Sequence, residues 1–172
     1  MKGKIFNAQE VQAIIAGTKT IFREVIKPQL PVKCPYQVGQ KIFVKEEIAH
    51  GGYFGACFVY CADGTKSNKM WQTHWSRHFR PANYMNEKQS RLTLEITDIK
   101  VERLGEISED DAIKEGIPLS NEFKDRYYTP ENNYAVPKIA FMRWWNATHK
   151  KPEEKFEANP WVWAIDFEVV KC

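Results

Sequence analysis

The sequence lacks a long hydrophobic run. Its first residues, Met1 to Lys4, are followed by the polar residues Asn7, Gln9 and Glu10. A secretory signal needs an apolar stretch of about 7 to 15 residues at this place, and a membrane-spanning helix needs about 20. We therefore expect a cytoplasmic protein without a membrane segment.

Cysteine is scarce, with four residues in 172. Cys57 and Cys61 lie on one predicted strand and so stand roughly 13 Å apart, too far for a disulfide or a shared zinc ion. His74 and His78 have a helical spacing that suits a metal, but no third ligand is near in sequence. We expect an amphipathic surface helix there, reduced thiols, no metal site and no cofactor.

The common catalytic and phosphate-binding motifs are also absent. Gly17-Thr18-Lys19-Thr20 lacks the upstream glycine and the Gly-Lys pair of a P-loop, and no G-x-G-x-x-G, G-x-S-x-G or H-E-x-x-H pattern occurs. P-loop NTPases, dinucleotide-binding enzymes, α/β-hydrolases and zincins are thereby disfavoured. A hydrolase of another kind would have to use scattered residues.

The charge is not strongly of one sign, with a formal net charge of +3. This value permits contact with nucleic acid but does not demand it. Aromatic residues are plentiful, with six Trp, seven Tyr and ten Phe. Some could stack on bases, although most should belong to a core.

A capped helix and the segment after it are the clearest local signal. Asn7 and Glu10 have capping-box spacing, and Gly17 suits the left-handed residue that ends a helix. Lys19, Thr20 and Arg23 follow directly and could hold a phosphate or a polar nucleobase. The alternative is that they are solvated charges, which a helix C-terminus favours in any case.

The pattern of elements predicts an α+β fold in a single domain over residues 1–172. Strands are expected at 23–26, 41–46, 57–60, 92–101 with a bend after 97, and 161–169. Further helices are expected after Ser108 and from Pro137, and long surface loops at 65–90 and 118–136. About five or six strands with helices outside fit a small closed or half-closed β-barrel, and a doubly wound parallel sheet is disfavoured.

The motifs, taken in order, resemble the ASCH domain of the PUA-like superfamily, and in particular the ASCH-type proteins of phages and prophages called morphogenetic. The resemblance extends over nearly the whole chain. It rests on Gly17-x-Lys19-Thr20-x-x-Arg23, Val25-Ile26-Lys27-Pro28, Tyr36-x-Val38-Gly39, Phe43-Val44-Lys45-Glu46, Tyr60-x-Ala62-Asp63-Gly64, Arg80-Pro81, Arg91 to Thr97, Val101 to Leu104, Ile107 to Gly116, and Asn159 to Trp163.

The resemblance implies a small PUA-like β-barrel with a basic cleft beside the first helix that binds RNA or a nucleotide-like ligand. Lys19, Thr20, Arg23, Lys45 and Glu46 would line or brace that cleft. Lysine and arginine attract phosphate, and a carboxylate can accept a base amino group. For Glu46 the alternative is an ion pair that holds Lys19 or Arg23.

Two other functions stay open. Some small ASCH proteins remove an acetyl group from acetylated cytidine with a Lys, a Thr three residues later and a Glu. Those positions hold Lys19, Phe22 and Glu115 here, so Lys19 and Glu115 would be the catalytic pair and the nucleophile position departs from the pattern. A ribonuclease would be a related enzyme. The third possibility is a phage assembly protein that binds a protein partner.

Overall fold

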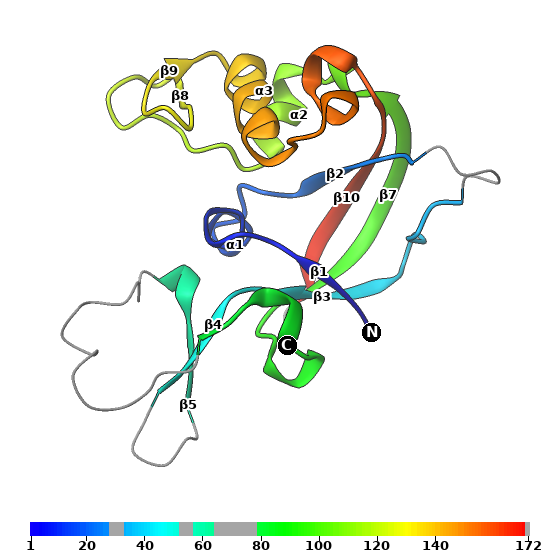
Figure 1. Ribbon diagram of the computed structural model, residues 1–172, viewed down its shortest axis with the longest axis vertical. Coiled ribbons are helices and arrows are strands. Elements are labelled where there is room, and N and C mark those ends of the chain that lie inside the picture. The colour runs from blue at the N-terminus through cyan, green and yellow to red at the C-terminus, as the bar shows by residue number, and fades with distance from the viewer. Residues whose placement is uncertain (28–32, 52–56, 64–78, 171–172) are drawn as a thin grey trace.

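The main sheet of the computed structural model has five strands in the order β1-β3-β7-β10-β2 (Figure 1). The structure describes residues 1–27, 33–51, 57–63 and 79–170. A second sheet has the order β5-β4-β6, and a hairpin joins β8 to β9. The strands are β1 (Lys2–Ile5), β2 (Ile21–Val25), β3 (Lys41–Lys45), β4 (Ile48–Gly51), β5 (Cys57–Tyr60), β6 (Phe79–Arg80), β7 (Thr93–Arg103), β8 (Tyr127–Tyr128), β9 (Tyr134–Ala135) and β10 (Trp161–Val170).

The long strands β7 and β10 form the middle of the main sheet. They pair antiparallel along their whole length, with a register shift between Asp166 and Phe167. Asp166 stands opposite Asp98 and Phe167 opposite Ile96, so Thr97 is an extra residue on β7. This bulge lies at the bend predicted after Thr97, and because of the extra residue Leu94, Ile96 and Ile99 all pack in the same apolar core.

The sheet is open between its two outer strands, β1 and β2. The α+β class is confirmed, but the described residues give no closed barrel. Strand β1 was not predicted, because Lys2-Gly3-Lys4-Ile5 has no apolar alternation. It is held by parallel pairing with β3, which is a contact between segments far apart in sequence. Within the described residues, β1 and β2 each pair with another strand of this sheet along one edge only.

Three of the predicted helices lie in the described residues and are found: α1 (Ala8–Ile15), α2 (Glu109–Lys114) and α3 (Pro137–Thr148). The Asn7–Glu10 capping box is present, the Ser108 side chain accepts from the backbone of Asp111, and Pro137 opens α3. Each start therefore follows from a local cap or from the fixed φ of proline.

An apolar core lies on each face of the main sheet. One core packs α1 against the sheet, and the other packs α2 and α3 against the opposite face (Figure 1). The first core contains Phe6, Val11, Ile14, Phe22, Tyr36, Ile42, Val44, Ala62, Leu94, Ile96, Ile165 and Phe167, and the second contains Leu104, Ile107, Ala112, Ile117, Ala135, Ala140, Phe141, Trp145 and Val162.

The two predicted long loops have different outcomes. Residues 118–136 were predicted as a long polar surface loop, and the short β8–β9 hairpin lies within them. The aromatic contacts of Tyr134 with Phe123 and Tyr128 support that hairpin. Most of the 65–90 loop, with His74 and His78, lies outside the described residues, as does Cys172. None of the described helices has both the length and the apolar character that crossing a membrane requires.

Candidate functional site

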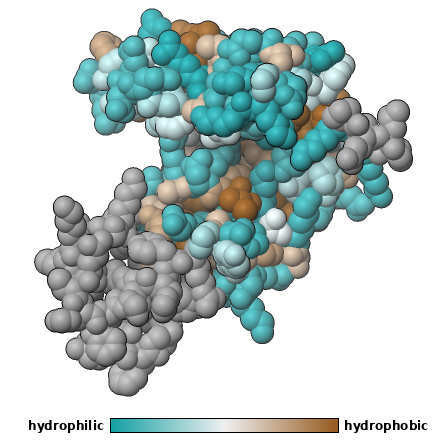
Figure 2. All heavy atoms as spheres, in the orientation of Figure 1, coloured by the Kyte–Doolittle hydropathy of each residue, from teal (hydrophilic) through white to brown (hydrophobic). Residues whose placement is uncertain are grey.

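A cavity of about 490 Å³ lies between β2, the start of α1 and helix α3. In the space-filling view it lies in the region hollowed between the upper and lower parts of the molecule (Figure 2). Its walls come from segments far apart in sequence: Lys4 to Asn7, Gln9 and Glu10, Lys19, Phe22 to Val25, Lys27, Glu115 to Ile117, Phe141, Trp144, Trp145, Thr148, His149 and Glu154.

Lys19 is the buried cation at the inner end of the cavity. Gly17 has a φ of +74°, which ends α1 and turns the chain so that Lys19 forms an isolated bridge with Glu115. The ammonium donates to the Glu115 backbone carbonyl at 2.9 Å and to Glu115 Oε2 at 2.8 Å, and it lies 3.5 Å from Glu10 Oε1. Lys19 is therefore fixed by carboxylates of two helices.

Arg23 lies on β2 and is also enclosed by carboxylates. Its Nε donates to Glu102 Oε1 at 2.8 Å, its Nη1 donates to Glu115 Oε1 at 2.8 Å, and its Nη2 lies 3.5 Å from Asp111. Burial acts to lower the pKa of Arg23, but Glu115 and Glu102 outweigh it and raise the pKa. The side chain has no exposed surface. A guanidinium in this state positions Glu115 and has no face open to a phosphate.

Glu115 connects the two cations. It follows the last residue of α2, and Gly116 then reverses the chain with a φ of +77°. A Cβ on Gly116 would lie 2.7 Å from the Cβ atoms of Ala13 and Lys19, so only glycine permits this close approach. Each carboxylate oxygen accepts one hydrogen bond from Lys19 or Arg23, and a carboxylate has about four acceptor positions. Glu115 can thus accept further bonds from a ligand.

The cavity is not basic, in contrast to the prediction. Four cations line it, and four carboxylates line it as well, with His149 as a further titratable group. Lys4 forms an ion pair with Glu24, which also accepts from the Tyr36 hydroxyl. The charges cancel because each buried cation needs an acid when it is taken out of water. The cations are Lys4, Lys19, Arg23 and Lys27, and the acids are Glu10, Glu24, Glu115 and Glu154.

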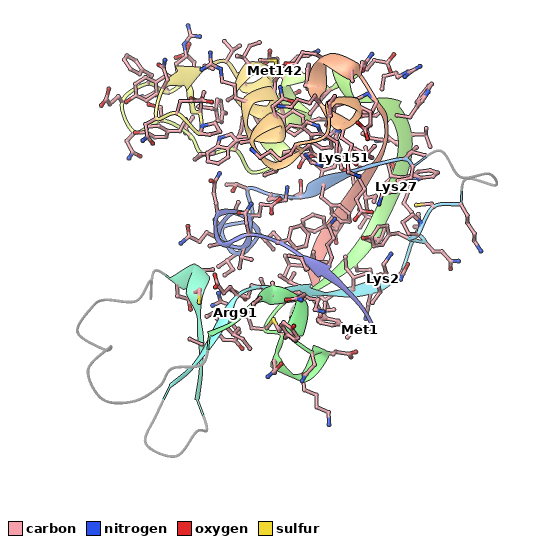
Figure 3. All side chains as sticks on the ribbon, viewed as in Figure 1. Met1, Lys2, Lys27, Arg91, Met142 and Lys151 are labelled. Carbon is pink, nitrogen blue, oxygen red and sulfur yellow. The ribbon has the colours of Figure 1, made fainter. Side chains whose placement is uncertain are left out.

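Thr20, Lys45 and Glu46 are not among the described residues that line the cavity. The Lys45 ammonium donates to the carbonyl of Asn83. Glu46 is buried and accepts two hydrogen bonds from Arg91, so its partner is Arg91 and neither Lys19 nor Arg23. Figure 3 labels Arg91 in the lower part of the molecule and Lys27 at the outer end of β2. The structure thus brings together Lys19, Arg23 and Glu115 but not the other three predicted residues.

Phe22 occupies the position of the missing threonine and belongs to an aromatic cluster. Its ring contacts Phe6, Tyr36 and Phe167 at centroid distances of 5.5 to 5.9 Å. Thr148 carries the one hydroxyl among the described residues that line the cavity, and it is hydrogen-bonded to the carbonyl of Trp145. The described part of the wall therefore offers no hydroxyl beside Lys19 and Glu115.

A helix from Pro137 was predicted, but its side chains were not predicted to line the site. Trp144 is half-buried, and its indole N–H donates to the Tyr128 carbonyl. His149 stacks on Trp145 with a centroid distance of 3.8 Å and an interplanar angle of 8°. The i,i+4 spacing of Trp145 and His149 was a signal for this stack. No local signal places α3 opposite β2.

The comparisons with known proteins give a likeness of fold alone. No family model matches the chain, and no curated protein matches it. The crystal structure of protein EF3133 from Enterococcus faecalis V583, family model DUF984, is similar over 99% of this chain and 81% of that one, with 11% identity and a TM-score of 0.49. An ASCH domain from Lactobacillus crispatus JV V101 is similar over 98% of this chain and 78% of that one, with 15% identity and a TM-score of 0.47.

The fold resembles that of an ASCH domain. TM-scores below 0.5 at such low identity describe the general course of the chain, so the ASCH-like fold lends no weight to any function. The phage context is not tested by these structures and stays a prediction. Among the described residues, no three His, Cys, Asp or Glu side chains gather to hold a metal ion.

Proposed function

We propose that this protein binds RNA or a nucleotide-like ligand, and that the base and sugar of one nucleotide occupy the cavity beside β2. The observation that carries the proposal is the fixed carboxylate of Glu115, held by Lys19 and Arg23 at the wall of a cavity that also has aromatic side chains. Ligand cavities of about 300 to 1,000 Å³ accept molecules of this size.

The cavity's chemistry suits a polar, uncharged heterocycle. Glu115 retains acceptor positions for the N–H groups of a base or the hydroxyls of a ribose. Trp144 is half-buried and lines the cavity from α3, where it offers a ring for stacking. Single-stranded RNA is commonly recognised by such stacking together with hydrogen bonds to base edges.

We expect the phosphate of the ligand to contact a residue at the rim of the cavity and none in its interior. The guanidinium of Arg23 is buried and ion-paired with Glu102 and Glu115, whereas Lys27 lines the cavity and is exposed. An exposed lysine can neutralise a phosphate without losing a structural partner. The nucleotide would then lie with its base inward and its phosphate near Lys27.

The proposal is tested by binding of a short single-stranded RNA, matched DNA and free nucleosides. Trp144→Ala should weaken RNA binding by about 5- to 150-fold, since stacking is worth about 1–3 kcal/mol per base. Trp161→Ala is the matched control, because Trp161 is exposed on β10 and stacks with Arg103 away from the cavity. An equal effect of both substitutions, or no binding of any probe, would contradict the proposal.

A hydrolase acting on a modified nucleoside or RNA is the second candidate. One observation favours it: Lys19 Nζ and Glu115 Oε2 are 2.8 Å apart at the cavity wall. Because Phe22 is part of the aromatic core, the nucleophile would have to be water that Glu115 activates. Acetate release from acetylated cytidine that Glu115→Gln abolishes would support this enzyme, and absence of turnover at high protein concentration would reject it.

The other predictions from the sequence stay predictions. No contact among the described residues favours a phage assembly partner over a nucleic-acid ligand. The roles of Thr20, Lys45 and Glu46 in binding, the cytoplasmic location and the single domain over residues 1–172 likewise stay predictions.

A further inference from the structure

The backbone of β2 has one edge paired and one edge free. Two backbone hydrogen bonds to β10 show which β2 residues point their N–H and C=O groups toward β10 and which point them away from it. Ile26 N–H donates to the Trp161 carbonyl at 2.8 Å, and Phe167 N–H donates to the Thr20 carbonyl at 2.9 Å. In an antiparallel pair the hydrogen-bonded positions alternate. The N–H and C=O groups of Phe22 and Glu24 therefore face β10, and those of Ile21, Arg23 and Val25 face the other way.

The free edge of β2 opens onto the cavity at Arg23 and Val25. Four successive β2 residues, Phe22 to Val25, line the cavity, as expected when it runs along the strand's edge. Toward Ile21 the edge is closed, because Thr20 N–H donates to the Lys114 carbonyl and Lys19 bridges to Glu115. No hydrogen bond from another described element reaches the backbone of Arg23 or Val25.

The cavity also extends to both faces of the strand. Phe141 and Trp144 come from the α3 side, where the Arg23 guanidinium lies 5.9 Å from the Phe141 ring centroid. Phe6 and Asn7 come from the α1 side, where Phe6 packs on Phe22. A flat molecule placed in the plane of the β2 edge would therefore have walls above and below it.

We propose that the free backbone edge of β2 binds the hydrogen-bonding edge of a nucleobase, with the N–H and C=O groups of Arg23 and Val25 as donors and acceptors. This inference rests on the proposed function and specifies how the cavity recognises its ligand. A residue facing outward on an antiparallel edge presents its N–H beside its C=O. Adenine and cytosine present a ring acceptor beside an amino donor, which is the complementary pattern.

The geometry favours a base over an added peptide strand. Strand addition draws its affinity from a row of main-chain hydrogen bonds. Here the outward groups that line the cavity belong to Arg23 and Val25, and the edge is closed toward Lys19. Two residues suit a planar heterocycle of one ring system, with Glu115 nearby for a further polar group.

Val25→Pro tests the inference directly, because it removes one outward N–H and no hydrogen bond to β10. Proline is tolerated on an edge strand at such a position. Val25→Ala is the matched control, since it shortens the side chain and keeps the N–H. With adenosine and cytidine as probes, Val25→Pro should bind at least tenfold more weakly than Val25→Ala, and equal binding by the two variants would contradict the inference. Far-ultraviolet circular dichroism and a thermal melt check that both variants are folded.

A measurement on the unchanged protein keeps the test decisive if Val25→Pro does not fold. Amide NMR signals of Arg23 and Val25 should shift on titration with adenosine or cytidine, and their hydrogen exchange should slow. If the Trp144 indole signal shifts while these amides do not, the edge inference is wrong and the proposed function stands. If neither nucleosides nor RNA bind, both are wrong. Amide shifts with an extended peptide but not with nucleosides would also overturn the inference.

Discussion

The left-handed glycines Gly17 and Gly116 set the position of the charged network at the scale of single residues. Gly17 releases the chain from α1 so that Lys19 turns inward, and Gly116 places Glu115 against it. The surroundings of the two glycines differ. No atom lies within 4 Å of a Cβ built on Gly17, whereas a Cβ on Gly116 would meet Ala13 and Lys19.

Gly116→Ala should destabilise the protein more than Gly17→Ala. The left-handed backbone alone costs a non-glycine residue roughly 1–2 kcal/mol, and this is the loss expected for Gly17→Ala. Gly116→Ala adds a 2.7 Å contact with two Cβ atoms, so its loss in the free energy of unfolding should exceed that of Gly17→Ala. Urea denaturation of both variants measures the difference, and equal losses would show that the close approach at Gly116 is not maintained.

The sequence predicted Lys19 and Arg23 in a binding cleft and Lys19 with Glu115 as the catalytic pair of an alternative enzyme, and it placed Thr20, Lys45 and Glu46 in the cleft as well. Lys19, Arg23 and Glu115 follow helix ends, whose caps are local signals that survive in the fold. The positions of the Lys45 and Glu46 side chains depend on hydrogen bonds with Asn83 and Arg91, which are far away in sequence. Residue spacing carries no information about such partners.

At the scale of elements, β7 and β10 bring two acids face to face. Asp166 stands opposite Asp98, and Asp166 Oδ2 is buried without a hydrogen-bond partner among the described residues. Burial raises the pKa of Asp166, Asp98 and Asp111 raise it further, and Lys100 and Lys114 act against them. Like charges directly opposite in a sheet are destabilising.

Asp166→Asn should therefore stabilise the protein at neutral pH, by a few tenths to about 1 kcal/mol. A carboxyl whose folded pKa is raised favours folding below its unfolded pKa of 3.8, and that contribution is lost as the pH rises through the folded value. The increase in the free energy of unfolding from Asp166→Asn should thus be complete at pH 7 and should disappear below about pH 4. Thermal melts across this range measure it, with Asp125→Asn on an exposed loop as the control. A gain that is independent of pH would contradict the assignment.

Helices and strands were predicted correctly where the sequence shows a repeating apolar pattern or a helix cap, and short strands without such a signal were missed. The alternating residues of β7 and β10 and the starts of all three helices were predicted. Strand β1 and the β8–β9 hairpin were missed, because a four-residue strand and two two-residue strands are too short to show a period. Their stability comes from pairing and from aromatic contacts that the sequence order does not display.

At the scale of the whole molecule, the balance of charge in the cavity limits how strongly salt acts on binding. The net charge is +3, and the four cations of the cavity face four acids. Each phosphate contact with single-stranded RNA contributes a slope of about −0.7 to log K against log salt. A ligand held by its base and by one or two rim lysines should show little of this dependence.

The slope of log K against log salt for a short RNA should therefore be about −1 to −1.5, and Lys27→Gln should reduce its magnitude by about 0.7. Lys124→Gln is the control, because Lys124 is exposed in the 118–136 segment outside the cavity. Affinities measured at several salt concentrations give the slopes. A slope steeper than about −4 would indicate many phosphate contacts elsewhere on the surface and would contradict binding centred on the cavity.

The sheet order has a consequence for the time at which the cavity can form. Strand β2 belongs to the first part of the chain, but its ladder partner is β10, residues 161–170. During synthesis β2 would therefore expose both of its edges until residue 170 has been made, and unpaired edges invite wrong pairing. A chain that ends before β10 would therefore keep every residue that lines the cavity and yet leave β2 without its partner strand.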